Sequence, residues 1–345
     1  MPPPGGRPGR PLCSPYHGVA ADRVYRNGRF HAVPWALAPR FHPCSAARKS
    51  GGVDDPLEVI LYDPLAIRLS HGFIRLGISA NAVTLLSLFF GIGGSLLFYT
   101  SNRWINLLGM ALVLFSAILD CCDGQVARLT GTSSQLGRVL DGAADFLNYL
   151  AIYLVLGLRL MGEPIPFTDM PWSFYIWPLL LLAMLCHSGQ ARMADYYKGL
   201  HLFFLKGEDR SSLARSRDLQ AELEALPREA SAFERIYRRF YLNYTRQQEK
   251  ATPKAQRLLK AMDGAEAETR REISRTYVSE SKDHIYLTNL LVYNIRTFVL
   301  FAMLLLGTHA FYPLLVILLL EGIKLLMIRC YEAVADSVYK RFTAF

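Results

Sequence analysis

The sequence has few charged residues for its length. Charged residues make up 19% of the 345-residue chain, whereas apolar residues make up 52%. This balance disfavours an intrinsically disordered chain, which is rich in charge and poor in apolar residues. Stretches with almost no charge, such as Ser79–Thr100 and Phe311–Leu320, approach the ~20 residues that cross a bilayer. A soluble globular protein is therefore disfavoured as well.

Disulfide and signal-peptide patterns are also missing. The six cysteines show neither a CxxC motif nor the spacing of a disulfide framework, so we expect free thiols. The first residues, MPPPGGRPGRP, contain no apolar core of a signal peptide. Residues 1–52 are rich in Pro, Gly and Arg, which favours a disordered tail over a folded domain.

The sequence does contain six apolar segments. We predict membrane spans at roughly 79–99, 104–120, 138–160, 172–193, 286–306 and 309–327. The net charge is +9, and the excess of Lys and Arg lies outside the spans. Arg103 is the only basic residue clearly within the short loops 100–103, 161–171 and 307–308. The positive-inside rule therefore predicts an all-α, multi-pass integral membrane protein with both termini and the insertion between spans four and five in the cytoplasm.

Four regions flank or make up these spans. Residues 53–78 are predicted to form an amphipathic helix in the headgroup plane. Its apolar face consists of Leu65, Leu69, Phe73 and Leu76, and its polar face of Arg68, His71 and Arg75. Residues 79–197 contain spans one to four, 198–284 form a cytosolic helical insertion, and 285–345 contain spans five and six with a C-terminal tail.

The insertion is compatible with three roles. It could form a helical hairpin over the mouth of an active site, dock a partner, or serve as a spacer. Arginines alternate with aromatic residues in its middle, a pattern that suits anionic lipid better than nucleic acid. These residues are Arg235, Arg238, Arg239 and Arg246 with Phe233, Tyr237, Phe240, Tyr241 and Tyr244.

Four aspartates form the most informative pattern. Asp120 and Asp123 are spaced i,i+3 near the end of the second predicted span, and Asp141 and Asp145 are spaced i,i+4 at the start of the third. Each pair projects from one helical face, and a helical hairpin brings the pairs together. Unpaired charges at this depth are costly, and two divalent cations neutralise four carboxylates. Oxygen ligands favour Mg²⁺, Mn²⁺ or Ca²⁺ over zinc or copper.

Small and basic residues accompany the aspartates. Gly124, Ala127 and Gly137 leave space on the same faces, and Arg128 supplies a fork for phosphate. Taken singly, a small residue in a span is most often a packing contact and a lone Asp is often a proton relay. Metal ions bridged by aspartates are a known arrangement for phosphoryl transfer. The combination favours such a site at the cytoplasmic membrane surface.

Two polar residues, Asn81 and Thr84, open the first span. Helix capping explains one of them, and contact with a ligand headgroup explains the other.

One motif resembles the signature of the CDP-alcohol phosphotransferases, which are six-span membrane enzymes that make phospholipids: Asp120-x₂-Asp123-Gly124-x₂-Ala127-Arg128-x₈-Gly137-x₃-Asp141-x₃-Asp145. The resemblance extends over about 54–195 and 286–330, and it does not cover 1–52 or 198–284. It implies that the hydroxyl of an alcohol attacks a CDP-linked donor, usually CDP-diacylglycerol, and that CMP leaves. It also implies a frequent homodimer, and the sequence leaves the oligomeric state open.

The resemblance assigns a role to each matching position. Asp120, Asp123 and Asp141 are implied as the principal ligands of two Mg²⁺ ions, for which Mn²⁺ can substitute. Asp145 is implied at the edge of the metal site, as a ligand and as the base that takes the proton of the acceptor. The implied nucleotide and diphosphate pocket consists of Asn81, Thr84, Gly124, Ala127, Arg128 and Gly137.

The acceptor is left open among inositol, inositol phosphate, glycerol phosphate, serine and an amino alcohol. Phe146 to Tyr149, after the fourth Asp, differ from the Lys or Arg associated with phosphatidylglycerophosphate and many phosphatidylinositol-type synthases. Arg192 and Arg296 are candidates to bind an anionic acceptor. For Arg296, a buried ion pair with Glu321, which Lys324 could join, explains the residue equally well.

A second hypothesis belongs to another functional class. A non-catalytic membrane carrier or scaffold could retain a metal-dependent lipid or nucleotide site. Release of CMP separates the two hypotheses.

Overall fold

The computed structural model describes residues 55, 58–206, 213–227 and 231–343. The predicted disordered tail, 1–52, lies outside the described residues. The described part is helical and contains no strand. Its main helices are α2 (Asp63–Arg75), α3 (Ala80–Leu96), α4 (Arg103–Thr130), α5 (Gln135–Met161), α6 (Ile176–Lys206), α7 (Ser216–Glu224), α8 (Ala232–Ala251), α9 (Pro253–Asp263), α10 (Ala267–Ser281), α11 (Ile285–Leu290), α12 (Tyr293–Leu306), α13 (Tyr312–Leu314) and α14 (Glu321–Thr343).

Six helical segments among the described residues are long and apolar enough to cross a membrane, which confirms the predicted fold class. They are Ala80–Tyr99, Arg103–Thr130, Val139–Met161, Ser173–Lys206, Ala267–Leu306 and His309–Thr343. Several continue well past the predicted ends. The second runs to Thr130 and the sixth to Thr343, because polar, helix-forming sequence extends each helix beyond its apolar part.

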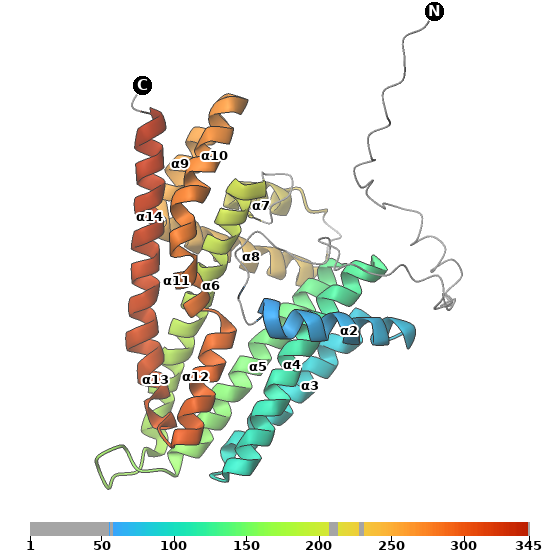
Figure 1. The fold of residues 1–345 in the computed structure, drawn as a ribbon, viewed down its shortest axis with the longest axis vertical. Helices are drawn as coiled ribbons and strands as arrows, with labels where there is room; N and C mark the ends of the chain where they lie inside the picture. The colour runs from blue at the N-terminus through green and yellow to red at the C-terminus, as the bar shows by residue number, and fades with distance from the viewer. Residues whose placement is uncertain (1–54, 56–57, 207–212, 228–230, 344–345) are drawn as a thin grey trace, which may run out of the picture.

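The spans stand in two groups (Figure 1). The blue-green and green helices α3, α4 and α5 form one group, and α6 with α12 to α14 forms the other. The short helix α2 runs crosswise to the spans, against α4. One end of the bundle carries α9, α10 and the C-terminal part of α14.

Helix α2 is held in its crosswise position by a small, polar face. Ala66 and Ser70 are fully buried, and Ser70 Oγ donates to the carbonyl of Cys122 at 3.2 Å. The predicted apolar face is therefore divided. Leu69 and Phe73 pack against the bundle, whereas Leu76 and, to a lesser degree, Leu65 remain exposed. The left-handed conformation of Gly77 (φ 70°) ends this segment before the first span.

Helices α3 and α4 approach each other closely at two glycines. A Cβ on Gly109 would lie 2.7 Å from the carbonyl oxygen of Gly94, and a Cβ on Gly94 would lie equally close to that of Gly109. Small residues at such crossings let helix backbones pack directly. This contact fixes the register of α3 against α4, which carries the first two aspartates.

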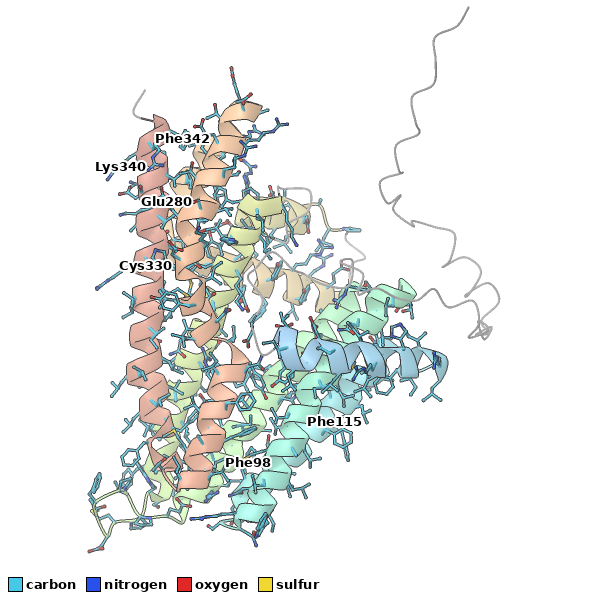
Figure 2. The ribbon with its side chains drawn as sticks, in the orientation of Figure 1. Phe98, Phe115, Glu280, Cys330, Lys340 and Phe342 are labelled. Carbon is cyan, nitrogen blue, oxygen red and sulfur yellow. The ribbon has the colours of Figure 1, made fainter. Side chains whose placement is uncertain are left out.

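The insertion contains four helices, α7 to α10, and is more elaborate than a hairpin. Helix α6 runs nine residues into it, to Lys206. Helices α9 and α10 pack along α14, and Glu280 of α10 lies near the end of α14 that carries Lys340 and Phe342 (Figure 2). Arg341 pairs with Glu280 at 3.2 Å. The insertion is thereby anchored to the extended sixth span.

A cluster of polar side chains lies at the opposite end of the bundle. Arg159 Nε pairs with Glu163 at 2.9 Å, and His309 Nε2 lies 2.8 Å from the other oxygen of Glu163. Arg159 Nη1 also donates to the carbonyls of Phe98 and Thr100, each at 3.0 Å. Burial acts to raise the pKa of Glu163, but hydrogen bonds from His309 and Arg159 outweigh it and lower the pKa below its usual value of 4.5.

The four cysteines in the described part of the chain, Cys121, Cys122, Cys186 and Cys330, are free. This agrees with the prediction from their spacing. Cys13 and Cys44 lie outside the described residues.

Candidate active site

The turn between α4 and α5 forms the helical hairpin that the aspartate spacing requires. Gly131 ends α4 in the left-handed conformation (φ 67°), which costs glycine little. Ser134 then caps α5, and its hydroxyl accepts from the backbone N–H of Gly137 at 2.9 Å. The hairpin turns α5 back so that Asp141 and Asp145 lie near Asp120 of α4.

Three of the four aspartates meet at one point. Asp120, Asp141 and Asp145 each offer a carboxylate oxygen, and these oxygens lie within 4.8 Å of one another. Asp145 is exposed, whereas the other two are half-buried. Oδ1 of Asp120 is buried and has no hydrogen-bond partner among the described residues. The hairpin therefore brings together the two pairs that the sequence predicts.

Asp123 lies at the edge of this cluster and is held by α3. It is 5% exposed, and its Oδ2 accepts a hydrogen bond from Thr84 Oγ1 at 2.5 Å. Thr84 also donates to the carbonyl of Ala80. The predicted helix cap is neither Asn81 nor Thr84, because Ser79 caps α3 by accepting from the N–H of Ala82 at 3.3 Å. Thr84 instead orients one of the predicted metal ligands.

The donor set fits a hard divalent cation. Asp120 interacts electrostatically with all three other aspartates, and Asp123 also interacts with Arg128. Converging carboxylate oxygens, one of them buried without a partner, are what Mg²⁺ or Mn²⁺ binds in proteins. In the metal-free protein these like charges repel. The residues present therefore match the predicted metal site at Asp120, Asp141 and Asp145, with Asp123 beside them.

The predicted nucleotide and diphosphate residues surround the cluster on two sides. On α4, the guanidinium of Arg128 covers Gly124, where a Cβ would lie 3.1 Å from Nη1 of Arg128. On the other side, a Cβ on Gly137 would lie 3.5 Å from Oδ1 of Asn81. Ala127 is half-buried on the same helix as Gly124. Larger residues at the glycines would fill space beside Arg128 and Asn81.

A buried polar contact below the aspartates escaped the sequence reasoning. Ser87 Oγ donates to the carbonyl of Ser116 at 3.0 Å, and Ser116 Oγ donates to the carbonyl of Ser87 at 2.8 Å. Asn148 Nδ2 donates to Ser116 Oγ at 3.4 Å. The Asn148 side chain also lies against Gly91, so a Cβ at position 91 would have no room. These contacts join α3, α4 and α5. The sequence signal for this contact was the presence of polar residues within apolar spans, one helical turn from Thr84 and Asp145.

Arg192 lies on α6 and contacts the insertion. Its Nη1 donates to Oε1 of Gln247 at 2.5 Å, and its guanidinium lies 5.7 Å from the ring centroid of Tyr244. One turn away, Asp195 interacts electrostatically with both Asp145 and Tyr244. Helix α6 thus comes close to the aspartate cluster on the side of Asp145, and neither Asp195 nor Tyr244 was predicted.

Arg296 lies deeper, on α12, and is 2% exposed. It donates to the backbone carbonyls of Leu291 at 2.6 Å and His187 at 3.4 Å, and its Nε has no partner among the described residues. The side chain borders a cavity of about 10 Å³, close to the space of one water molecule. The cavity is also lined by Tyr149, Ile152, Tyr153, His187, Tyr293, Thr297, Leu300 and Tyr312.

No direct ion pair joins Arg296 to Glu321 among the described contacts. Glu321 pairs instead with Lys324, and it also accepts from Gln190 Nε2 at 3.1 Å. Lys324 lies one helical turn from Glu321, so this pair forms locally. Tyr293 lines the Arg296 cavity and also interacts electrostatically with Asp145 and Asp120.

Comparison with known proteins identifies the segment that carries this site. Residues 78–194 match the family model described as CDP-alcohol phosphatidyltransferase. A phosphatidylinositol phosphate synthase of Mycobacterium marinum is 29% identical over 85 residues, which are 25% of this chain and 36% of the relative. A putative cardiolipin synthase of Mycobacterium bovis is 41% identical over 58 residues, which are 17% of this chain and 26% of the relative.

A third relative extends the similarity to a eukaryote. A CDP-alcohol phosphatidyltransferase class-I family protein of Dictyostelium discoideum, described as uncharacterised, is 29% identical over 141 residues, 37% of this chain and 31% of the relative. The matched segments thus span about a quarter to a third of these relatives. They confirm the resemblance that the aspartate motif indicated.

Proposed function

We propose that this chain, whose residues 78–194 form a CDP-alcohol phosphatidyltransferase domain, transfers a phosphatidyl group from CDP-diacylglycerol to the hydroxyl of an alcohol with release of CMP. The convergence of Asp120, Asp141 and Asp145 within 4.8 Å, with one buried oxygen unpartnered, carries the proposal. The six spans place such a site in an integral membrane protein, where a lipid donor is at hand.

Asp120, Asp123, Asp141 and Asp145 are the proposed ligands of two Mg²⁺ or Mn²⁺ ions. When bound, such ions stabilise negative charge on the attacking and leaving oxygens of a phosphoryl transfer. Thr84 donates to Oδ2 of Asp123 and so holds the orientation of this proposed ligand. Arg128 is the proposed contact for the diphosphate of the donor, because a guanidinium forms paired hydrogen bonds with phosphate oxygens.

Asp145 is the proposed base. It is the most exposed member of the three-oxygen cluster, so an incoming hydroxyl can reach it. A base must lie within hydrogen-bond reach of the proton that it removes. Gly124 and Gly137 leave space beside Arg128 and Asn81 for the nucleotide. Because the diphosphate would lie between these groups and the aspartates, the acceptor is expected to approach from the α6 and α8 side.

Arg192 and Arg296 remain proposed acceptor contacts. The position of Arg192 favours an anionic acceptor such as an inositol phosphate or glycerol phosphate, because a guanidinium pairs with phosphate and the same helix carries Asp195, which interacts electrostatically with Asp145. Arg296 borders a space too small for a sugar alcohol in this conformation, so its proposed role requires the cavity to widen. The proposed cytoplasmic orientation of the site rests on the excess of Lys and Arg outside the spans.

The test is CMP release by the purified full-length chain in vesicles with CDP-diacylglycerol, Mg²⁺ and one acceptor at a time. Inositol, inositol phosphate, glycerol phosphate, serine and ethanolamine form the panel. We expect CMP with at least one acceptor and its loss in Asp145→Asn, which keeps the fold because the side chain is exposed.

The control is thermal unfolding of the same variant, which should match the parent chain. CMP release near the parent rate by Asp145→Asn would remove Asp145 from the role of base. Binding of CDP-diacylglycerol with no CMP for any acceptor would favour the carrier hypothesis.

A further inference from the structure

The insertion exposes a compact apolar surface on α8. Ile236 is 66% exposed and Phe240 is 69% exposed, and their i,i+4 spacing places both on one helical face. Within the described residues of 213–281 these are the two large apolar side chains that remain exposed. The opposite face, with Leu242 and Thr245, is buried. The exposed pair therefore has no partner inside the described part of the chain.

The basic residues of α8 divide into occupied and exposed ones. Arg238 pairs with Glu222 and Glu234, each at 3.0 Å, and Arg235 donates to the carbonyl of Pro227 at 2.9 Å. Arg246 donates to Gln220 at 2.8 Å. Arg239 is exposed beside Phe240 and makes none of these contacts. The tyrosines of α8 stack along another face, with Tyr237 and Tyr241 parallel at 6.2 Å. The surface available to a partner is thus Ile236, Arg239 and Phe240.

Contacts with α6 fix the depth of α8. Gln248 Nε2 donates to the carbonyl of Arg192 at 3.0 Å, and Gln247 accepts from the guanidinium of Arg192. Arg192 lies about 28 Å along the helical span from Ser173, where the span begins. The hydrocarbon core is about 30 Å thick. Helix α8 is therefore attached where α6 leaves the apolar layer.

The direction of α8 agrees with this depth. It runs crosswise to the spans, as α2 does, and the two helices lie at a similar level of the bundle (Figure 1). Helix α2 exposes Leu65, and Leu76, which follows its last residue, is more exposed still. A helix in this position meets the headgroup region with its exposed face.

We propose that α8 is a second interfacial helix, which inserts Ile236 and Phe240 at the headgroup boundary and binds the phosphate of anionic lipids through Arg239. Aromatic and aliphatic side chains partition into this layer, and a nearby arginine adds attraction to anionic lipid. The bilayer that the six spans require is the partner nearest to this surface. The inference concerns the placement of the insertion and does not depend on catalysis.

Site-specific photocrosslinking tests the proposal in the full-length chain. The photoreactive residue p-benzoylphenylalanine replaces Phe240, and the protein is reconstituted in vesicles of phosphatidylcholine with phosphatidylglycerol. Phe89 on α3, also 69% exposed, is the matched site within a span. Arg217 on α7, whose side chain is 79% exposed, is the aqueous site. Mass spectrometry then identifies lipid adducts after illumination.

We expect lipid adducts at position 240 to approach those at position 89 and to exceed those at position 217. In vesicles without phosphatidylglycerol the adducts at 240 should decrease, and Arg239→Gln should abolish that difference while the adducts at 89 remain. Adducts at 240 no more abundant than those at 217 would overturn the proposal, as would crosslinks to a second copy of the chain in place of lipid. An Arg239→Gln variant that keeps the full response to phosphatidylglycerol would overturn the role of Arg239.

Discussion

Replacing Asp120 by Asn should stabilise the metal-free protein and remove its response to Mg²⁺. The ligand oxygens of Asp120, Asp141 and Asp145 lie within 4.8 Å of one another, and Oδ1 of Asp120 is buried without a partner. At an effective dielectric constant of ~20, two unit charges at this distance repel by about 3.5 kcal/mol. Asp120 takes part in two of the three pairs, so its neutralisation relieves the larger part of the repulsion.

The assay is thermal unfolding in detergent, with EDTA or with saturating Mg²⁺. Binding to the folded state alone stabilises a protein by about 2.7 kcal/mol when the ligand is at 100 times its dissociation constant. We therefore expect Mg²⁺ to raise the Tm of the parent chain. Asp120→Asn should have a higher Tm than the parent in EDTA and should gain little from Mg²⁺, because one charged ligand is missing.

The matched control is Asp169→Asn. Asp169 is exposed in the loop between α5 and α6, at the end of the bundle opposite to the aspartate cluster. The same chemical change there should leave both the Tm in EDTA and the Mg²⁺ response as in the parent. Two results would refute the reasoning: an Asp120→Asn variant that is less stable than the parent in EDTA, or one that keeps the full Mg²⁺ shift.

Three further predictions concern the supports of the site and the far end of the bundle. Thr84→Val removes the hydrogen-bond donor to Asp123. Because a lost hydrogen bond to a charged group costs ~1.5–3 kcal/mol, kcat/KM for CMP release should fall by about 10- to 100-fold. Thr84→Ser, which keeps the hydroxyl, should retain activity. Gly109→Val places a Cβ 2.7 Å from a carbonyl oxygen of α3, and this overpacking should lower the free energy of unfolding by about 1–3 kcal/mol. The Tm of this variant in detergent should therefore fall. Gly93 has open space around it, so Gly93→Val should leave the Tm unchanged. The pKa of Glu163 is lowered from 4.5, so the charged carboxylate stabilises the fold above pH 4.5. This stabilisation is lost as the pH falls through the lowered pKa. The Tm of the parent should therefore exceed that of Glu163→Gln most near neutral pH, and the difference should vanish in acid.

The spans and the aspartate pairs were predictable because both depend on local spacing. Apolar length identifies a span, and i,i+3 or i,i+4 spacing places Asp120 with Asp123 and Asp141 with Asp145 on single helical faces. The helix ends were less predictable. Polar sequence after Asp123 or beyond residue 327 prolongs a helix without adding apolar length, so hydropathy contains no signal for it. For the same reason Ser79, just before the predicted polar pair, was overlooked as the cap of α3.

Contacts between distant segments were not predictable from local patterns. Thr84 meets Asp123 and Arg192 meets Gln247 only after the helices pack. Pairing of Arg296 with Glu321, one of the two alternatives for this residue, rested on similar depth in two spans, but depth does not fix the direction of a side chain. Glu321 pairs with Lys324 on its own helix, which needs no long-range alignment.

The boundary of the family match has a consequence for the acceptor. The match ends at residue 194, so it includes the four aspartates and the glycines that surround them. Two groups that interact electrostatically with these aspartates lie beyond it: Asp195 at the next position and Tyr293 on α12. The segment shared with the relatives therefore contains the proposed reaction chemistry, whereas part of the proposed acceptor surface lies outside it. The names of the relatives therefore bear on the reaction chemistry, because their similarity lies mainly in the shared segment. The acceptor must be established by measurement on this chain.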